Sequence, residues 1–345
     1  MNNHIFLDPQ IFFLQRNGGI SRYFNSLISA SKAPCLYQIP FQPHPFVHRL
    51  PLSLRLFSYY LYSIFYFLRN PTQFYSSDPV HYTYYYPSLF GINTCRQFST
   101  FHDLVPEIMG GSIRNRLLSY FKLRHFRKKR IIFVSQATLL AAYRHYKTLP
   151  PYYQVVHHGH TLLPKPSQVQ VSLNKPFLLY VGHRYSYKNF GFILDTFACY
   201  PELSTNFELI IFGGNKLTHS EILHLKASCT SYRHLYGDDR LLSALYQQAS
   251  ALLYPSSMEG FGIPILESFS SFCPVVCFDQ SAMSEISSGH AFYIRSFTNK
   301  SLYSAIIQSV NSPADTPCLA LAHNHASSFL WTESLRLHFS FYGQL

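Results

Sequence analysis

The sequence predicts an α/β protein made of two doubly wound, Rossmann-like domains. Three observations lead to this fold class. The chain has 345 residues, which is long for one hydrophobic core and suits two domains. Short apolar runs alternate with helical stretches through the second half, as in a parallel sheet covered on both faces. The first half repeats this pattern less regularly, and the prolines and polar residues of 161–176 mark a linker between the halves.

The second half has the clearer pattern of strands and helices. Its expected strands are FLLYVG (177–182), FELIIFGG (207–214), HLYG (234–237), ALLYPS (251–256) and PVVCFD (274–279). Helices are expected between them, over 189–200, 218–229, 240–250 and 264–272. This strand–helix alternation is typical of a doubly wound sheet.

The first half is expected to build a similar sheet. A helix is expected after NGGIS, and the expected strands are HIFLD (4–8), CLYQIP (35–40), HYTYYY (81–86), QFSTFHD (97–103), RIIFVS (130–135) and YQVVHHG (153–159). We therefore expect two Rossmann-like domains that face each other across an interdomain cleft.

The composition excludes a disordered chain, because 47% of the residues are hydrophobic and 13% are charged. Seven cysteines form no CxxC pair, so free thiols in a reducing cytoplasm are expected. The first fifteen residues have no basic start before their apolar residues, and we expect no secretory signal.

The net charge of +12 lies entirely in the first half. Residues 1–170 carry 18 Lys and Arg against 4 Asp and Glu, whereas residues 171–345 carry 10 against 12. A basic half on an otherwise ordinary protein indicates an anionic partner: lipid headgroups, a phosphorylated acceptor or nucleic acid.

Two glutamates bracket an apolar, glycine-containing stretch in PSSMEGFGIPILES. On one straight helix, the eight positions from Glu259 to Glu267 would span about 12 Å. Pro264 instead suits the start of a helix, which would place Glu267 in its first turn and Glu259 on the loop before it. Both carboxylates could then line a crevice at the carboxyl end of the sheet, where ligands bind in open α/β folds.

The backbone N–H groups of Phe261, Gly262 and Ile263 could point to the same place, near a helix N-terminus that favours anions. One carboxylate could hold sugar hydroxyls and the other a ribose. The alternative is that Glu267 is an ordinary first-turn acid and Glu259 an unrelated surface residue.

Three further motifs carry candidate residues. In YVGHRYSYKNF, Arg184 and Lys188 follow the first strand of their domain and could neutralise a diphosphate, or could belong to a solvated basic loop. In RNGGISRYF, Gly19 could allow close approach of a phosphate or simply start a helix. In STFHDL, His102 follows a strand, although a lone histidine is more often structural than catalytic.

Taken together, these motifs resemble the retaining family 4 glycosyltransferases, which have the GT-B fold. The resemblance covers nearly the whole chain and is greatest to the bacterial surface-polysaccharide branch. It rests on GGISRYF, FHDLVPE, FVSQAT, VGHRYSYKNF, LLSALYQQASALLYPSSMEGFGIPILE, CPVV and FLWTESLRLHF.

The resemblance implies a role for each candidate residue. Glu259 would contact the donor sugar, Glu267 the nucleotide ribose, and His102 the sugar near its reacting carbon. Arg184 and Lys188 would hold the diphosphate, aided by the backbone of Gly19. It also implies an acceptor-binding domain over 1–165, a nucleotide-sugar-binding domain over 172–325, and a last helix, 326–345, that crosses back to the first domain.

Neither a metal nor another cofactor is expected. The chain has no D-x-D motif, because Asp238 and Asp239 are adjacent, so Arg184 and Lys188 would have to neutralise the diphosphate. The histidines of VVHHGH (155–160) do not have the spacing of a zinc site.

Two segments of the first half suggest contact with a membrane. LRLFSYYLYSIFYFLR (54–69) is aromatic, but its uncharged core of 13 residues is too short to cross a bilayer, which needs about 20. RNRLLSYFKLRHFRKKR (114–130) contains eight Lys and Arg. Interfacial docking explains both, and the alternatives are a buried core helix and a solvated basic face.

The sequence thus predicts a retaining glycosyltransferase that transfers a sugar from a nucleotide diphosphate sugar, GDP-mannose by resemblance, to a glycan or lipid-linked acceptor. It would work in the cytoplasm, peripherally on an anionic membrane surface, in the synthesis of surface polysaccharide or lipopolysaccharide. The alternatives are a nucleotide-sugar epimerase of the same fold and a basic nucleic-acid-binding protein. No repeated aromatic-basic motif supports the latter, so no nucleic acid partner is expected.

Overall fold

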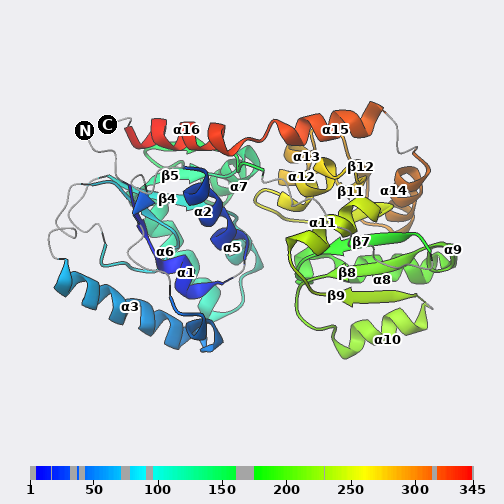
Figure 1. Ribbon diagram of the computed structural model, residues 1–345, viewed down its shortest axis with the longest axis horizontal. Coiled ribbons are helices and arrows are strands. Elements are labelled where there is room, and N and C mark those ends of the chain that lie inside the picture. Colours follow the sequence, from blue (N-terminus) through cyan, green and yellow to red (C-terminus); the bar gives the residue numbers. More distant parts are fainter. Residues whose placement is uncertain are drawn as a thin grey trace. The chain divides into compact units, whose positions relative to one another are not determined.

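The computed structural model divides the chain into two compact units, residues 1–159 with 330–345 and residues 160–329 (Figure 1). The structure describes residues 5–16, 18–31, 37–38, 43–70, 78–90, 96–160, 175–228, 230–312 and 317–343. Most of the expected linker over 161–176, and all but two residues of the expected strand CLYQIP, lie outside the described residues.

The second unit contains a six-stranded sheet in which every pair of neighbouring strands is parallel. Its order is β12-β11-β10-β7-β8-β9. The strands are β7 (Phe177–Val181), β8 (Glu208–Phe212), β9 (Tyr232–Leu235), β10 (Ala251–Tyr254), β11 (Val275–Phe278) and β12 (Phe292–Ile294). The first five are the strands expected from the sequence, and β12 was not expected.

Helices follow most of these strands, as the doubly wound pattern predicts. They are α8 (Phe190–Cys199), α9 (Pro201–Asn206), α10 (His219–Ala227), α11 (Asp239–Gln248), α12 (Ile263–Ser270), α13 (Ser281–Ser287), α14 (Asn299–Asn311) and α15 (Pro317–Ser327). Every residue of β8 and β10 is buried, as expected for strands covered on both faces.

The first unit contains a second parallel sheet, with the order β2-β1-β3-β4-β5-β6. Its strands are β1 (Ile5–Asp8), β2 (Tyr37–Gln38), β3 (Val80–Tyr82), β4 (Gln97–Phe101), β5 (Arg130–Phe133) and β6 (Tyr153–Val155). The predicted fold class, α/β with two Rossmann-like parallel sheets, is therefore confirmed.

Alternating strand residues face two different cores of the first unit. Leu7, Phe98 and Ile132 pack against α2 (Gly19–Ala30) and α16 (Trp331–Gly343). The other side of the sheet carries Phe6, Phe101 and, from β5, Ile131 and Phe133. It is covered by α3 (Leu52–Arg69), α6 (Ile113–Lys128) and α7 (Gln136–Tyr146). Figure 1 shows α16 and α3 on opposite faces of this sheet. The short helices α1 (Gln10–Leu14), α5 (Val105–Met109) and η1 (Pro45–Arg49) complete the unit.

The last helix, α16, packs against α2 in the first unit although it follows the second unit in sequence (Figure 1). Apolar burial and two buried hydrogen bonds hold it there. The Tyr342 hydroxyl lies 2.6 Å from Nδ1 of His81, and Nε2 of His338 lies 2.6 Å from the Tyr23 hydroxyl. Burial lowers the pKa of both imidazoles, and that of His338 is about 4, so both are neutral at pH 7.

The order of the second sheet defines where a ligand would bind. The chain runs from β7 through β8 to β9 on one side and then crosses to β10 on the other side of β7. In open α/β sheets, ligands bind beyond the carboxyl ends of the strands at such a switch point. The loops after β7 and β10 flank this position.

Candidate functional site

The loops after β7 and β10 contain four of the predicted donor-binding residues and are bonded to each other. The Asn189 side chain donates to the carbonyl of Pro255 over 2.8 Å, and the N–H of Ser257 donates to the carbonyl of Tyr187 over 2.8 Å. Because two hydrogen bonds fix one loop to the other, side chains on both can meet in a defined geometry.

Lys188 and Glu259 form a direct ion pair between these loops. Nζ of Lys188 donates to Oε1 of Glu259, and the two side chains are 17% and 14% exposed. The Lys188 ammonium also lies 5.3 Å from the ring centroid of Tyr254 and 5.5 Å from that of Tyr187. The sequence separates these two charges by seventy residues, and the structure brings them together at the switch point.

Glu259 also acts on the buried phenol of Tyr254. Burial, followed by the charge of Glu259, raises the pKa of Tyr254 well above its usual value, so the phenol stays protonated. Glu259 is therefore paired with Lys188 beside a protonated tyrosine.

Arg184 is held by the loop after β8 and by α10. Its Nε donates to Glu221 over 2.9 Å, and Nη2 donates to the carbonyls of Asn215 and Lys216 over 2.5 and 2.9 Å. Glu221 also closes the capping box of α10 with Thr218. The guanidinium is thus oriented before any ligand is present.

One nitrogen of the Arg184 guanidinium, Nη1, takes no part in these hydrogen bonds. Nη1 is buried and has no hydrogen-bond partner within the described residues. A Cβ atom at Gly214 would lie 3.1 Å from it, and Gly213 and Gly214 both adopt left-handed φ angles of about +75° and +72°. The glycine pair therefore keeps side chains away from a buried, positively charged donor.

Glu267 lies elsewhere on α12 than the sequence predicted. The helix begins at Ile263, one residue before Pro264, so Glu267 is its fifth residue and lies beyond the first turn. The expectation of a first-turn acid is wrong, because the helix starts earlier than its proline indicates. Glu267 is 2% exposed, and its Oε2 accepts a hydrogen bond from the Tyr246 hydroxyl on α11 over 3.1 Å.

The segment from Phe261 to Ile263 joins the loop to α12. Gly262 has φ +114° as the residue before the helix, a conformation that glycine adopts without strain. Phe261 is 5% exposed and packs edge-on to Phe329 at 6.0 Å. The loop is therefore held by burial of Phe261 on one side of Gly262 and by the helix on the other.

In the first unit, His102 follows β4 and packs against α2. Its ring centroid lies 5.0 Å from that of Tyr23, with the planes at 80°. The residue is largely buried, and its Nε2 has no hydrogen-bond partner within the described residues. Burial lowers the pKa of His102 to about 3, Asp103 opposes this shift and Lys122 adds to it, so the imidazole is neutral at pH 7.

Gly19 is the first residue of α2, the helix that also carries Tyr23. A Cβ atom at Gly19 would meet no described heavy atom within 4 Å. The packing of the described residues therefore does not require a glycine here. Through Tyr23, the helix that begins at Gly19 contacts His102.

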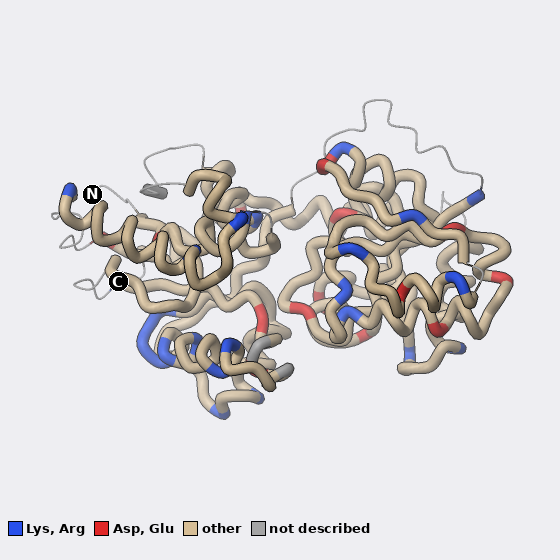
Figure 2. Tube along the Cα trace, turned by 90° about the horizontal axis from the view of Figure 1, so that it is seen from below, with Lys and Arg blue, Asp and Glu red and all other residues tan. Residues whose placement is uncertain are grey.

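The basic residues of the first unit gather where α6 lies, as Figure 2 shows. Of the eight Lys and Arg in 114–130, five are exposed: Arg114, Arg116, Arg124, Arg127 and Lys128. Lys122 is buried, and Lys129 and Arg130 lie against the rings of Tyr82 and Tyr152. The segment is thus divided between solvent and the fold.

The comparisons with known proteins match the second unit to one family. Residues 165–316 match the family model for glycosyl transferases group 1. The second unit is a glycosyltransferase group 1 domain. It contains both loops of the switch point, and with them Arg184, Lys188, Glu259 and Glu267.

Two curated relatives of the chain are named O-antigen chain mannosyltransferases. The chain is 33% identical over 115 residues to mannosyltransferase B of Escherichia coli, covering 32% of this chain and 30% of the relative. It is 27% identical over 218 residues to RfbU of Salmonella typhimurium, covering 61% of this chain and 60% of the relative. The chain thus matches less than two thirds of the length of either relative.

Solved glycosyltransferases share the fold over the whole chain. WaaG, a glycosyltransferase involved in lipopolysaccharide biosynthesis, superimposes with a TM-score of 0.69 and 18% identity over 98% of this chain and 99% of that chain. Alr3699/HepE of Anabaena, solved with UDP and glucose, gives a TM-score of 0.69 and 15% identity over all of both chains. The predicted GT-B fold and the predicted relationship to the glycosyltransferases are confirmed.

Several residues of this glycosyltransferase site were not found by sequence reasoning. Tyr246 donates to Glu267, Tyr254 interacts with Glu259, Glu221 orients Arg184, and Gly214 keeps a side chain away from Arg184. A glycine pair directly after the buried strand FELIIF was a usable signal, since it allows close backbone approach. The tyrosines gave no signal, because they read as core residues of a strand and a helix.

Proposed function

We propose that the protein transfers a hexosyl group, with retention, from a nucleotide diphosphate sugar to a glycan or lipid-linked glycan acceptor in surface polysaccharide or lipopolysaccharide synthesis. The observation that carries the proposal is the Lys188–Glu259 pair at the switch point of a glycosyltransferase group 1 domain. It holds a cation suited to phosphate and a carboxylate suited to sugar hydroxyls in contact with each other, as adjacent groups of one substrate require.

GDP-mannose is the donor we propose. The support for this donor is sequence similarity alone, since both curated relatives are named O-antigen chain mannosyltransferases. Arg184 and Lys188 would bind the diphosphate, with Nη1 of Arg184 supplying a donor already oriented by Glu221. Glu267 would bind the ribose, its carboxylate held by Tyr246. The backbone around Phe261, Gly262 and Ile263 would complete this pocket.

Glu259 and His102 are the proposed catalytic contacts. A diphosphate that approached Lys188 would compete for its ammonium and free Glu259 to accept hydrogen bonds from sugar hydroxyls. His102 would contact the sugar near its reacting carbon as a neutral imidazole, and the open space at Gly19 would let the backbone of α2 approach the phosphate.

The proposed reaction uses no enzyme nucleophile, because both glutamates are assigned to binding. The leaving diphosphate would depart and the acceptor hydroxyl attack on one face of the sugar, and the departing phosphate oxygen would take the proton of that hydroxyl. The C–O bond to phosphate breaks as the new glycosidic bond forms, which retains the configuration. Catalysis would come from positioning and from charge stabilisation of the leaving group.

Metal independence is part of the proposal. Within the described residues, no group of three or more His, Cys, Asp or Glu could hold a metal ion. If Arg184 and Lys188 neutralise the diphosphate, EDTA should leave turnover within about twofold of its untreated value. Loss of activity in EDTA that magnesium or manganese restores would contradict this assignment.

We also propose that the first unit docks on an anionic membrane surface from the cytoplasm. No helix among the described residues is long and apolar enough to span a bilayer. One face of α3 exposes a stripe of large apolar side chains with helical spacing: Leu54, Phe57, Leu61, Ile64, Phe65 and Leu68. The outer face of α6 exposes Ile113, Leu117 and Tyr120 in its first half and Arg124, Arg127 and Lys128 towards its end.

These two exposed faces suit a lipid surface together. Both helices cover the same face of the sheet, so their outer sides look away from the same core. Apolar side chains can insert at the headgroup boundary while each exposed Lys or Arg contributes about 1 kcal/mol near anionic lipid. Arg55, at the start of α3, takes no part in this, since it donates to the carbonyls of Leu14, His48 and Leu50.

Sedimentation with phosphatidylglycerol vesicles tests this docking. The triple variant R124Q/R127Q/K128Q should weaken binding about 100-fold, from roughly 1 kcal/mol per charge, while neutral phosphatidylcholine vesicles bind little of either protein. K226Q/R240Q/K300Q removes the same net charge from exposed positions of the second unit and serves as the control. Equal losses in both triple variants would rule out docking through α6.

The transferase proposal is tested with a panel of nucleotide sugars. GDP-mannose, UDP-glucose and UDP-N-acetylglucosamine are compared by nucleotide release and by thermal shift. Glu259→Gln removes the proposed sugar contact, and Glu202→Gln neutralises an exposed carboxylate on α9 as the matched control. We expect GDP-mannose turnover that Glu259→Gln lowers about 100-fold and Glu202→Gln leaves intact. Epimerised donor in place of released nucleotide would instead favour an epimerase.

A further inference from the structure

A lysine lies in the buried face of the basic helix α6. The buried residues of this helix are Leu118, Lys122, His125 and Phe126, which share one face by their spacing. The Lys122 side chain is 1% exposed. Three of these positions pack as a core stripe requires, whereas the fourth places an ammonium group in the same stripe.

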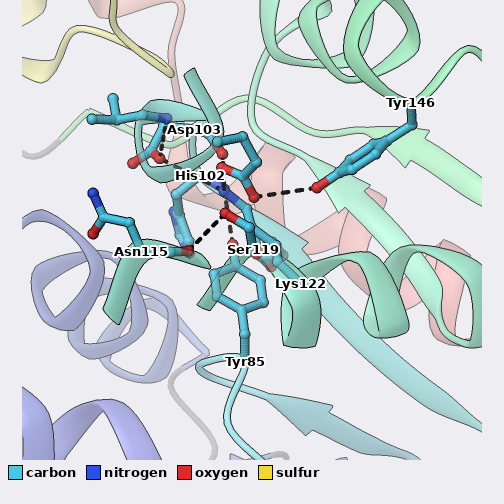
Figure 3. A network of polar contacts seen from close by, with 10 residues as sticks. Tyr85, His102, Asp103, Asn115, Ser119, Lys122 and Tyr146 are labelled. Atoms are coloured by element: carbon cyan, nitrogen blue, oxygen red, sulfur yellow. Dashed lines mark hydrogen bonds and ion pairs between the residues drawn. The ribbon is translucent and has the colours of Figure 1, made fainter. Parts of the chain in front are cut away.

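The Lys122 ammonium is enclosed by acceptors from the loop after β4 and from α5. Nζ donates to the backbone carbonyl of Asp103 and, over 3.1 Å, to Oε2 of Glu107. The Asp103 carboxylate lies 3.7 Å away, and the ring centroids of Tyr85 and Phe101 lie 5.2 and 5.3 Å away. Figure 3 shows Lys122 and Tyr85 converging on the segment that carries His102 and Asp103.

The same segment is held at each of its residues. The Tyr85 hydroxyl donates to the carbonyl of Thr100 over 2.7 Å and accepts from the N–H of His102 over 3.4 Å. The Asp103 carboxylate accepts from the N–H of Val105 over 3.0 Å and so starts α5. Lys122 binds the carbonyl between these contacts, which belongs to the residue directly after His102.

Stability alone does not account for this lysine. Replacing a buried ion pair by apolar side chains of similar size is often neutral or stabilising, because desolvation offsets the attraction between the charges. An apolar residue such as methionine would continue the stripe of α6. Lysine differs from methionine because its ammonium bonds the backbone carbonyl of Asp103. That bond fixes the direction of the preceding side chain, His102.

We propose that Lys122 is a positioning residue for His102, fixing the backbone of residues 102–104 so that the imidazole keeps the orientation its task requires. The inference rests on the proposed function, in which His102 contacts the donor sugar. Lys122 itself does not touch substrate: its ammonium is enclosed, and it acts through the carbonyl of Asp103. A misplacement of about 1 Å can lower a rate about 100-fold, so the hydrogen bond from Lys122 matters beside those of Tyr85 and Asp103.

Two variants of the full-length protein separate this role from simple stability. In E107Q, Lys122 keeps both its carbonyl acceptor and the Asp103 carboxylate, so residues 102–104 stay fixed. In K122M/E107Q the ion pair is removed from both sides, which avoids an uncompensated buried Glu107, but the carbonyl of Asp103 loses its donor. Should the double variant fail to fold, K122Q/E107Q replaces it. The glutamine side chain at position 122 is shorter than lysine. It should therefore bond the amide at position 107 and leave the Asp103 carbonyl without its donor.

Hydrogen–deuterium exchange and kinetics are measured on both variants. We expect exchange of the 102–105 amides to be at least about tenfold faster in K122M/E107Q than in E107Q, with other segments unchanged. For GDP-mannose, kcat should fall about 10- to 100-fold in the double variant. KM and the affinity for GDP, which the second unit would bind, should stay within about threefold.

Each outcome decides the proposal. Equal exchange of the 102–105 amides in the two variants overturns it, because Lys122 then fixes nothing that the rest of the loop does not. Faster exchange with unchanged kcat also overturns it, since the loop would move without consequence. If the unaltered protein turns over no nucleotide sugar, the proposed function fails, and the exchange comparison still shows whether Lys122 fixes the segment.

Discussion

The two units each contain a lysine–glutamate pair, and the two pairs are built alike. Lys188–Glu259 lies in the second unit and Lys122–Glu107 in the first. In both, the ammonium lies within about 5.5 Å of two aromatic ring centroids. In both, a tyrosine interacts with the glutamate: the charge of Glu259 acts on the phenol of Tyr254, and the Tyr146 hydroxyl donates to Glu107 over 3.2 Å.

The pairs differ in their access to solvent. The side chains of Lys188 and Glu259 are 17% and 14% exposed, whereas those of Lys122 and Glu107 are 1% and 0% exposed. A partly exposed pair can exchange its partner for a ligand, because water and ions reach it. A sealed pair cannot do so. Similar chemistry is therefore open to a ligand in one unit and closed to it in the other.

Of all the tests, acid pH should give the largest difference in stability between the two units. Burial lowers the pKa of His102 and His125 to about 3 and that of His338 to about 4, and it also lowers the pKa of His81 and His158. All five lie in the first unit. In the unfolded chain they take up protons below about pH 6.5, so stability is complete above that pH and is lost as the pH falls towards the folded values.

Each of these imidazoles can contribute up to about 1.4 kcal/mol per pH unit, so the first unit should lose several kcal/mol between pH 6.5 and 5.5. Urea unfolding followed by hydrogen exchange at pH 7.0 and 5.5 measures each unit separately. Faster exchange of β7 and β10 than of β4 and β5 at pH 5.5 would contradict this expectation.

Removing each lysine is the next largest test of the comparison. Lys122→Met leaves Glu107 buried without a countercharge, which should cost about 3–5 kcal/mol of unfolding free energy. Lys188→Met leaves Glu259 where water reaches it, so the cost should be about 1–2 kcal/mol. Chemical denaturation of the two variants checks this. Equal costs would show that exposure does not distinguish the pairs.

The sequence predicted the strands of the second unit better than those of the first, because the strands of the two units differ in burial and length. FLLYVG and ALLYPS are strands buried on both faces, so continuous apolar runs identify them directly. In the first unit, β1 alternates between two cores, and its neighbour β2 is two residues long in the described part. Short, aromatic-rich strands of this kind carry a weaker signal.

The sequence named the residues of the candidate site but not the contacts between them. Spacing and motif identify Arg184, Lys188 and Glu259, yet nothing in the sequence indicates that Lys188 and Glu259 meet, because the contact depends on the adjacency of β7 and β10. The basic segment 114–130 shows the limit most clearly. Its charges look alike in the sequence, but Lys122 falls on the buried face of α6 and Arg127 on the exposed face.

Neutralising the glutamate of each pair should separate turnover from stability. Glu259→Gln keeps the shape of the side chain but removes the charge that would contact the sugar, and we expect kcat to fall about 100-fold, or roughly 2.7 kcal/mol. Glu107→Gln should leave kcat within about threefold. Initial rates of GDP release from GDP-mannose measure both. A large loss in Glu107→Gln would mean that the sealed pair also acts in the reaction directly.

Glu267 sharpens the comparison within the second unit, because it is a buried carboxylate that a tyrosine hydroxyl holds. Glu267→Gln should weaken GDP binding about tenfold, or roughly 1.4 kcal/mol, if the carboxylate accepts hydrogen bonds from the ribose hydroxyls. Calorimetric titration with GDP checks this. Glu259→Gln is the control, since it should leave GDP affinity within about threefold: GDP has no sugar beyond its phosphates.

The two tyrosines provide the smallest and most selective test. Tyr254→Phe removes the hydroxyl that interacts with Glu259, and Tyr146→Phe removes the one that donates to Glu107. Each variant loses one polar interaction with a glutamate, worth about 1 kcal/mol, and the losses should appear in different measurements. Tyr254→Phe should lower kcat about tenfold with a small change in stability, because Glu259 keeps Lys188. Tyr146→Phe should lower the unfolding free energy by about 1 kcal/mol and leave kcat unchanged, because Lys122 still grips Asp103. A kcat loss in both variants, or in neither, would contradict the assignment of turnover to the Lys188–Glu259 pair and of stability to the Lys122–Glu107 pair.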